Sequence, residues 1–232
     1  RMTLVNEPMS ADEGAACTSD DRVDLSLQAA THWDGLCHVS YDGHIYNGYP
    51  ADGIDEAGAG RCGIHRITSL TTRGVLLDVA RVKGLDVLEQ SYPITAADLD
   101  AAEELAGTAV RSGDVVLVRT GAQAHLPDDK WAYTLAGTGL TMETALWFHE
   151  RDVAAVATDT ITFEVYPFDE GIDLAVHLLH LVEMGMTQGQ NWVLDELAAD
   201  CANDGQYDFL LEASPLPFVR AVGSPVNPVA LK

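Results

Sequence analysis

Two short segments of the sequence carry histidines at spacings that suit chemistry. In the first, His32 and Asp34 are two residues apart at the end of a stretch that alternates apolar and polar side chains, and His38 follows. On a β-strand His32 and Asp34 share one face, so an imidazole nitrogen and a carboxylate oxygen can approach the same point. This donor pair suits Zn²⁺, Mn²⁺ or Fe²⁺ better than Ca²⁺ or Mg²⁺. Taken alone, the spacing favours simple hydrogen bonds of the two side chains with each other or with the backbone at a strand end.

The second segment begins with His177 and His180, which are three residues apart. On a helix these two side chains occupy neighbouring positions of one face. Histidines on an apolar helix are often core residues, so the spacing alone does not separate a packing role from a chemical one. Gln190 follows after a stretch that contains Gly185 and Gly189.

The composition excludes several classes of partner. The chain has 232 residues, 36 Asp plus Glu against 13 Lys plus Arg, and a formal net charge of −23. Such a surface repels phosphates and anionic lipids, so we expect no nucleic-acid partner and no membrane partner. No apolar run approaches the roughly 20 residues of a membrane span, and no signal peptide is recognisable. The four cysteines form no CxxC pair, which predicts a soluble, cytoplasmic protein without disulfides.

The hydrophobic pattern predicts a single mixed α/β domain over residues 1–232, lacking some residues at its N-terminus. Alternating and short apolar runs predict strands at 24–34, 75–79, 115–119, 153–157 and 207–211. Capping residues and longer apolar patterns predict helices at 95–105, 141–148, 174–184 and 195–201. We expect loops at 1–22 and 42–63 and an extended tail after 211.

Segment 31–38 resembles the metal-binding signature of the cyclase-type metal-dependent hydrolases, the group that contains bacterial kynurenine formamidase and isatin hydrolase. Their pattern is His-x-Gly-Thr-His-x-Asp-x-Pro-x-His. The resemblance continues over nearly the whole chain, through 46–48, 113–121, Asp159 with Glu164, His177, 185–197 and 223–228. It implies an α/β fold with a mixed, barrel-like β-sheet flanked by helices, of the swivelling β/β/α type. It also implies a homodimer or homotetramer.

The resemblance implies one divalent metal ion, Mn²⁺ or Zn²⁺, held by His32, Asp34 and Gln190. Gln28 stands where the family has its first histidine, which argues against a second metal. Gln190 stands where many members have a glutamate. By the same resemblance His38 is the expected general base, and His177 is a catalytic residue that contacts the substrate.

The resemblance predicts hydrolysis of a C–N amide bond in a small, aromatic amide or lactam, such as an aryl formamide or an isatin-like compound. The candidates for contacts with this small-molecule substrate are Trp33, Tyr46, Asn47 and Phe163, although an aromatic residue is more often part of the core. Two alternatives remain open at this point. One is a metal-dependent cyclase or dehydratase, and the other is a metal-containing module that binds a small molecule without catalysis.

Overall fold

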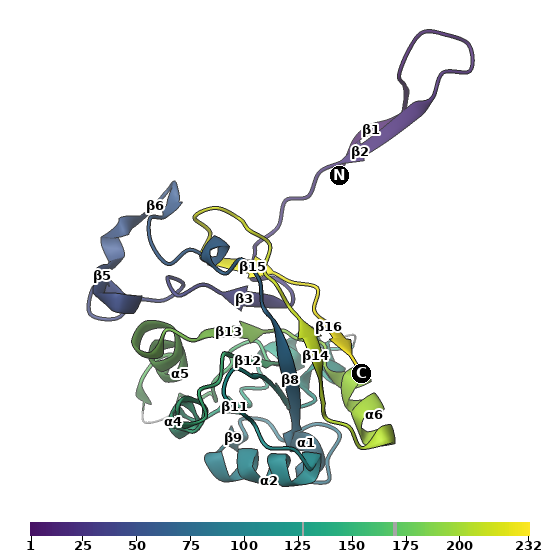
Figure 1. Cartoon of the computed structure of the whole chain (residues 1–232). Helices are drawn as coiled ribbons and strands as arrows, with labels where there is room; N and C mark the ends of the chain where they lie inside the picture. Colours follow the sequence, from purple (N-terminus) through teal and green to yellow (C-terminus); the bar gives the residue numbers. More distant parts are fainter. Residues whose placement is uncertain (127, 169–170) are drawn as a thin grey trace.

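A mixed β-sheet of eight strands is the frame of the molecule (Figure 1). The computed structural model describes residues 1–126, 128–168 and 171–232. The strands lie in the order β15-β3-β13-β12-β10-β8-β14-β16, and the central four, β13, β12, β10 and β8, are parallel. The sheet curls into a half-barrel with helices against it, which confirms the expected α/β class. In chain order the strands are β3 His32–Asp34, β8 Thr71–Asp78, β10 Val115–Arg119, β12 Ala155–Thr158, β13 Thr187–Gln190, β14 Asp208–Glu212, β15 Gly223–Pro225 and β16 Val229–Leu231.

Along the sequence most of the helices come between strands of the sheet, and in space the helices cover both faces of the sheet (Figure 1). They are α1 Val79–Val82, α2 Ala96–Ala106, α3 Lys130–Thr134, α4 Met142–Glu150, α5 Ala175–His177 and α6 Asp195–Asp204. Helix α5 continues directly into a π-helix, η6 Leu178–Met184. The remaining short elements are β4 His44–Ile45, η1 Tyr46–Gly48, β5 Tyr49–Pro50, η2 Ala51–Gly53, β6 Ile54–Asp55, β7 Gly58–Ala59, η3 Ile64–Arg66, β9 Pro93–Ile94, η4 Ala122–His125 and β11 Gly139–Leu140.

The central strands are apolar on both faces, because helices cover both. Val116 and Val118 of β10 pack into one cluster with residues of α2 and α4. Val115 and Leu117, which alternate with them, pack into a second cluster with residues of α6. The continuous apolar run at 115–118 is therefore buried between two cores, within the strand that the sequence predicts at 115–119.

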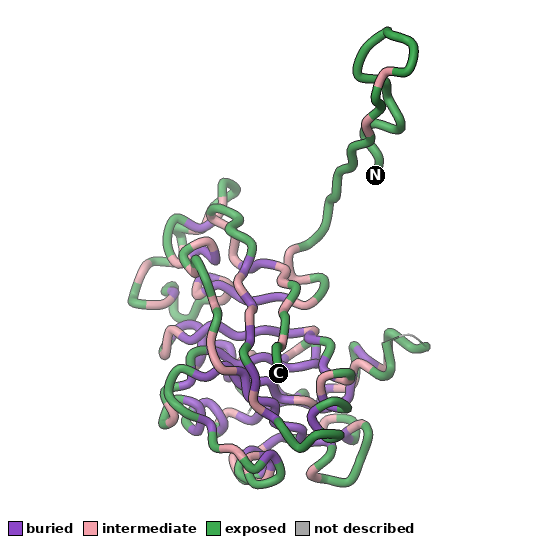
Figure 2. The backbone as a smooth tube through the Cα atoms, turned by 45° about the vertical axis from the view of Figure 1, so that its right-hand side comes forward, coloured by how far each residue is buried: buried purple, intermediate pink, exposed green. Residues whose placement is uncertain are grey.

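Two predictions for the N-terminal part of the chain are wrong. Residues 1–22 are not a loop, because strands β1 Met2–Pro8 and β2 Cys17–Asp21 pair into an antiparallel hairpin. This hairpin projects away from the sheet at the end of an exposed connection (Figures 1 and 2). Only 32–34 of the expected strand 24–34 is a strand, since only these residues find partners in β13 and β15.

The other predicted helices and strands are present with small shifts at their ends. Helix α2 has the predicted capping box, in which Thr95 and Asp98 each accept a backbone hydrogen bond from the other. The segment 174–184 is helical but changes to a π-helix after His177. No helix among the described residues has both the length and the apolar character needed to cross a membrane.

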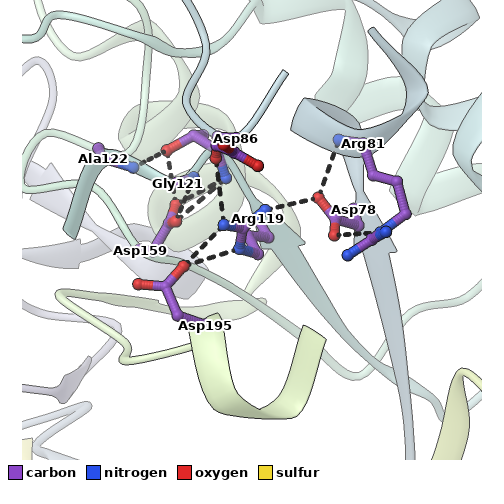
Figure 3. Close-up of polar contacts among 9 residues, drawn as sticks. Asp78, Arg81, Asp86, Arg119, Gly121, Ala122, Asp159 and Asp195 are labelled. Carbon is purple, nitrogen blue, oxygen red and sulfur yellow. Dashed lines mark hydrogen bonds and ion pairs between the residues drawn. The ribbon is translucent and has the colours of Figure 1, made fainter. Parts of the chain in front are cut away.

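A partly buried arginine, Arg119, ties the end of β10 to three other segments (Figure 3). The guanidinium of Arg119 donates to Asp78 at 3.0 Å, to Asp195 at 2.7 Å and to the carbonyl of Asp86 at 3.1 Å. Asp78 is fully buried and also accepts from the backbone and side chain of Arg81. Burial lowers the pKa of Arg119, but the two carboxylates outweigh burial and raise it. The network therefore fixes β10 against α1 and α6.

Replacement of Arg119 with Met should lower the free energy of unfolding by about 3–5 kcal/mol, because it leaves the buried Asp78 carboxylate without its main partner. Urea titration measures this loss. The matched control is Arg81→Met, which removes a 44% exposed partner of the same carboxylate. That change should cost less than about 1 kcal/mol. Equal losses in the two variants would contradict the assignment of the buried ion pair.

Asp159 is fully enclosed beside this network and should make stability depend on pH. It accepts hydrogen bonds from the backbone N–H groups of Thr120 and Gly121 and from the Thr120 hydroxyl. Burial outweighs these bonds and raises the pKa of Asp159 to about 6. The folded state then holds a proton that the unfolded state releases near pH 4, so stability falls as the pH rises between these values.

The wild-type protein should therefore lose stability relative to Asp159→Asn as the pH rises. We expect a loss of about 1.5 kcal/mol between about pH 5 and pH 7.5, and little change at higher pH. Urea unfolding of both proteins across this range gives the difference directly. A difference that does not vary with pH would show that Asp159 titrates normally.

Candidate metal centre and active site

The pairing of β3 with β13 brings the two histidine-containing segments together. His32 lies opposite Gln190, and Trp33 lies opposite Gly189. Alternate residues of a strand face opposite sides, so His32 and Asp34 share one face of the sheet. The Thr187 hydroxyl donates to the Asp34 carbonyl and reinforces this register.

Asp34 is the centre of the polar cluster and is completely buried. Its Oδ2 accepts a hydrogen bond of 2.9 Å from the amide nitrogen of Gln190 and lies 3.8 Å from His177 Nε2. Its Oδ1 lies 3.5 Å from His32 Nε2 and 3.7 Å from His38 Nε2. Burial raises the pKa of Asp34, but the nearby His32 side chain and the charges of the surrounding histidines outweigh burial and lower the pKa. The carboxylate is therefore ionised at neutral pH.

His177 is held by Glu164 on one side and faces Gln190 on the other. Its Nδ1 lies 2.6 Å from Glu164 Oε2, and its Nε2 lies 3.1 Å from the Gln190 amide nitrogen. Burial lowers the pKa of His177, whereas the bond to Glu164 and the charges of Glu164 and Asp34 raise it, and the net shift is upward. The Glu164 carboxylate thus orients the imidazole, as carboxylates do for many functional histidines.

His38 approaches Asp34 from the solvent side. The backbone N–H of His38 donates to the Gly35 carbonyl at 2.8 Å and so closes a turn. This turn directs the His38 side chain back toward β3. The side chain is 30% exposed, whereas that of Asp34 is 0% exposed. Burial lowers the pKa of His38 more than the nearby Asp34 raises it. A neutral imidazole at the edge of the cluster can accept a proton.

The donor atoms around Asp34 fit a divalent cation. His32 Nδ1 lies 2.7 Å from the Ala30 carbonyl, which assigns its proton to that nitrogen and leaves the Nε2 lone pair facing Asp34 Oδ1. Asp34 Oδ1 and Gln190 Oε1 are both buried without a hydrogen-bond partner. Among the described residues, no three His, Cys, Asp or Glu side chains lie together in positions that could hold a metal ion. The predicted ligand set counts the amide oxygen of Gln190 as the third donor beside His32 and Asp34.

The four candidate substrate contacts fall in different places. Trp33 faces the core beyond the sheet, where it packs edge to face on Trp192 at 4.8 Å. A Cβ at Gly189 would lie 2.9 Å from the Trp33 ring, so glycine is required at this crossing. Trp33 is therefore a core residue and does not face the cluster. Phe163 is also fully buried, with its ring 6.2 Å from that of His177.

Tyr46 and Asn47 lie in η1, beside the end of the π-helix. The Tyr46 ring covers Gly185, where a Cβ would come within 2.3 Å of it, and Gly185 has a φ of +68°. Tyr46 is half-buried and Asn47 is exposed. Their contact with a substrate stays a prediction, as do the roles of His38 and His177 and the ligand set His32, Asp34 and Gln190.

The role of Glu164 is not evident from the sequence. The resemblance places Glu164 in a matching motif, but no spacing rule connects it to His177 thirteen residues later. A bridge between Leu140 and Glu164 and a positive φ of 67° at Phe163 turn the Glu164 side chain toward α5. Only the folded chain shows this pair.

Comparisons with known proteins support a family assignment. The model of the family described as "Putative cyclase" matches residues 3–165. No curated protein matches the chain significantly. A crystal structure described as a novel cyclase has 36% identity and a TM-score of 0.90, over 100% of this chain and 79% of that one.

Two further solved structures share the fold at lower identity. Isatin hydrolase A from Labrenzia aggregata, bound to benzyl benzoate, has 18% identity and a TM-score of 0.67, over 100% of this chain and 82% of that one. A potential metal-dependent hydrolase with cyclase activity has 18% identity and a TM-score of 0.57, over 89% of this chain and 80% of that one. The family match over most of the sequence and the 36% identity to the novel cyclase confirm the resemblance, and this chain belongs to the Cyclase family.

Proposed function

We propose that the protein is a metal-dependent hydrolase that cleaves a C–N amide bond of a small aromatic amide or lactam. The observation that carries the proposal is the Asp34 carboxylate, buried with one oxygen unpartnered between the imidazoles of His32 and His38. An ionised, unpaired carboxylate oxygen is costly in the interior unless a cation compensates it. Membership of the Cyclase family and the likeness to isatin hydrolases support the same chemistry.

His32, Asp34 and Gln190 are the proposed metal ligands. Gln190 must present its amide oxygen for this role, which a half-turn of the amide achieves, because its nitrogen now faces Asp34 and His177. A bound Mn²⁺ or Zn²⁺ supplies Lewis acidity, which polarises a carbonyl and lowers the pKa of water. A single metal ion is consistent with Gln190, because a neutral amide adds no negative charge that would stabilise a second cation.

His38 is the proposed general base. It is the partly exposed member of the cluster, and its Nε2 lies 3.7 Å from Asp34 Oδ1. A neutral His38 accepts the proton of the attacking water and returns it to the leaving nitrogen. His177, fixed by Glu164, is the proposed contact to the substrate, and Tyr46 and Asn47 are the proposed outer contacts at the end of the π-helix.

Removal of the metal tests the reaction class. EDTA should abolish hydrolysis of an aryl formamide or of isatin, and Mn²⁺ or Zn²⁺ should restore it. In ¹⁸O-labelled water the product should gain one labelled oxygen, because hydrolysis adds water across the C–N bond. Mass spectrometry measures this uptake. Activity that survives chelation would exclude metal dependence. A product without labelled oxygen would favour the cyclase alternative.

The variant His38→Ala should lower kcat by about 10²–10⁴-fold while the protein still binds one Mn²⁺ per chain, because His38 transfers protons and is not a ligand. His44→Ala is the matched control. His44 is exposed and its side chain contacts the nearby Asp42 carbonyl at 2.8 Å, so its loss should leave kcat unchanged. Full activity of His38→Ala would remove His38 from the mechanism.

We also propose that the protein is a homodimer or homotetramer in which the N-terminal hairpin contacts another copy. The hairpin exposes Met2, Val5 and Met9 and lies apart from the sheet (Figure 2). A two-stranded ribbon without other contacts is at best marginally stable in water. A neighbouring copy supplies the apolar surface that this chain does not provide.

Removal of residues 1–24 should convert the assembly into monomers, as measured by light scattering after size-exclusion chromatography. The control is Trp131→Ser, which removes an exposed aromatic side chain on α3 and should leave the mass unchanged. A truncated protein that keeps the mass of the assembly would exclude the hairpin as the main contact.

A further inference from the structure

A second polar pair lies beside the proposed active site and takes no part in it. The side chains of His180 and Gln188 are completely buried, and His180 Nδ1 lies 3.0 Å from Gln188 Oε1. Burial lowers the pKa of His180 to about 3, so the ring is neutral and donates this hydrogen bond through its Nδ1–H. The pair therefore forms a neutral hydrogen bond in the interior.

This pair repeats the connection made by His177 and Gln190. His177 and His180 lie three residues apart on the continuous helix α5–η6, and Gln188 and Gln190 lie on one face of β13. The imidazole of His177 faces the amide of Gln190 at 3.1 Å, and that of His180 faces the amide of Gln188 at 3.0 Å. Two parallel polar contacts thus join the same helix to the same strand.

The surroundings of His180 are aromatic. Its ring packs edge to face on Phe148 at 5.8 Å and on Phe163 at 5.5 Å. In such a pocket a hydrogen-bonded polar pair adds little stability over two apolar side chains of similar size. A buried polar pair does restrict which alignment of two elements is allowed, because any other alignment leaves both partners unpaired.

The helix needs such a restriction because it is π-helical where His180 lies. Residues 178–184 form a π-helix of seven residues. This conformation is rare and is found mostly at functional sites. The His180 carbonyl accepts the backbone N–H groups of both Gly185 and Met186 where this helix ends. A return to α-helical winding would rotate the side chains after His177 relative to β13.

We propose that His180 and Gln188 are positioning residues, whose hydrogen bond holds the α5–η6 helix in register with β13 so that His177 and Gln190 meet at Asp34. The functional part of this inference rests on the proposed metal-dependent activity. The structural part, which is the alignment of His177, does not depend on that activity. His180 touches neither Asp34 nor His32 and is not a catalytic residue.

The test replaces both partners with apolar side chains of similar size, in the double variant His180→Leu, Gln188→Met. The pair is then removed without leaving an unpaired group, so the unfolding temperature should stay close to that of the wild type. Two readouts report the register. One is the proton NMR signal of the His177 Nδ1–H in its 2.6 Å contact with Glu164, assigned by its absence in His177→Asn. The other is the Kd for Mn²⁺ from calorimetry.

We expect the His177 signal to shift or disappear in the double variant and the Kd for Mn²⁺ to rise about tenfold or more, as when outer partners of metal ligands are lost. An unchanged signal with an unchanged Kd in a folded double variant would overturn the proposal. If the double variant does not fold, Gln188→Met alone replaces it, with the same expected changes and the same overturning result.

Leu181→Ala is the matched control. Leu181 is fully buried on the same π-helix, so its truncation lowers the unfolding temperature through a cavity and leaves the polar pair in place. Its His177 signal and its Kd for Mn²⁺ should equal those of the wild type. If the wild type itself binds no Mn²⁺, the proposed function fails, and the His177 signal alone decides the positioning role.

Discussion

The cluster at the end of β3 depends on the complete burial of the Asp34 carboxylate. An ion removed from water costs several kcal/mol unless its oxygens find hydrogen bonds or opposite charge. Asp34 obtains its neighbours from four separate parts of the chain: its own strand, the turn that follows it, helix α5 and strand β13. Each of these parts must be placed within a fraction of an ångström, because a carboxylate oxygen that misses its partner is left unpaired in the interior.

The alternation of β-strand residues separates packing from chemistry. On one face of β3 and β13, Trp33 and Gly189 pack against Trp192 in an apolar core. On the other face, His32, Asp34 and Gln190 meet the α5–η6 helix. Since a slip of one residue between the two strands would exchange these faces, the packing of Trp33 over Gly189 also secures the polar cluster.

Local patterns in the sequence predict most of the helices and strands, because those signals lie within the elements themselves. The apolar run at 115–118 and the capping box at Thr95 are of this kind. The strand predicted at 24–34 fails over its first part because the alternation of Leu25 and Leu27 has no neighbouring strand to meet. The hairpin β1–β2 is missed because its residues are almost all exposed, so their pattern gives no sign of a buried face.

For the candidate site, the sequence predicts that His32 and Asp34 share a face, since two residues on one strand are enough to establish it. The approach of His177 and Gln190 requires the strand order of the whole sheet. The contact between Glu164 and His177 depends on a positive φ at Phe163, a position at which nothing in the sequence indicates a turn.

The position of β3 in the sheet also has a consequence for biosynthesis. This strand is translated before both of its neighbours, which are β13, near residue 190, and β15, near residue 225. The polar cluster can therefore assemble only after β13 has been translated, and the second neighbour of β3 follows with β15. A nascent chain that stops before β15 contains every residue of the cluster but lacks one of the two strands that hold it in place.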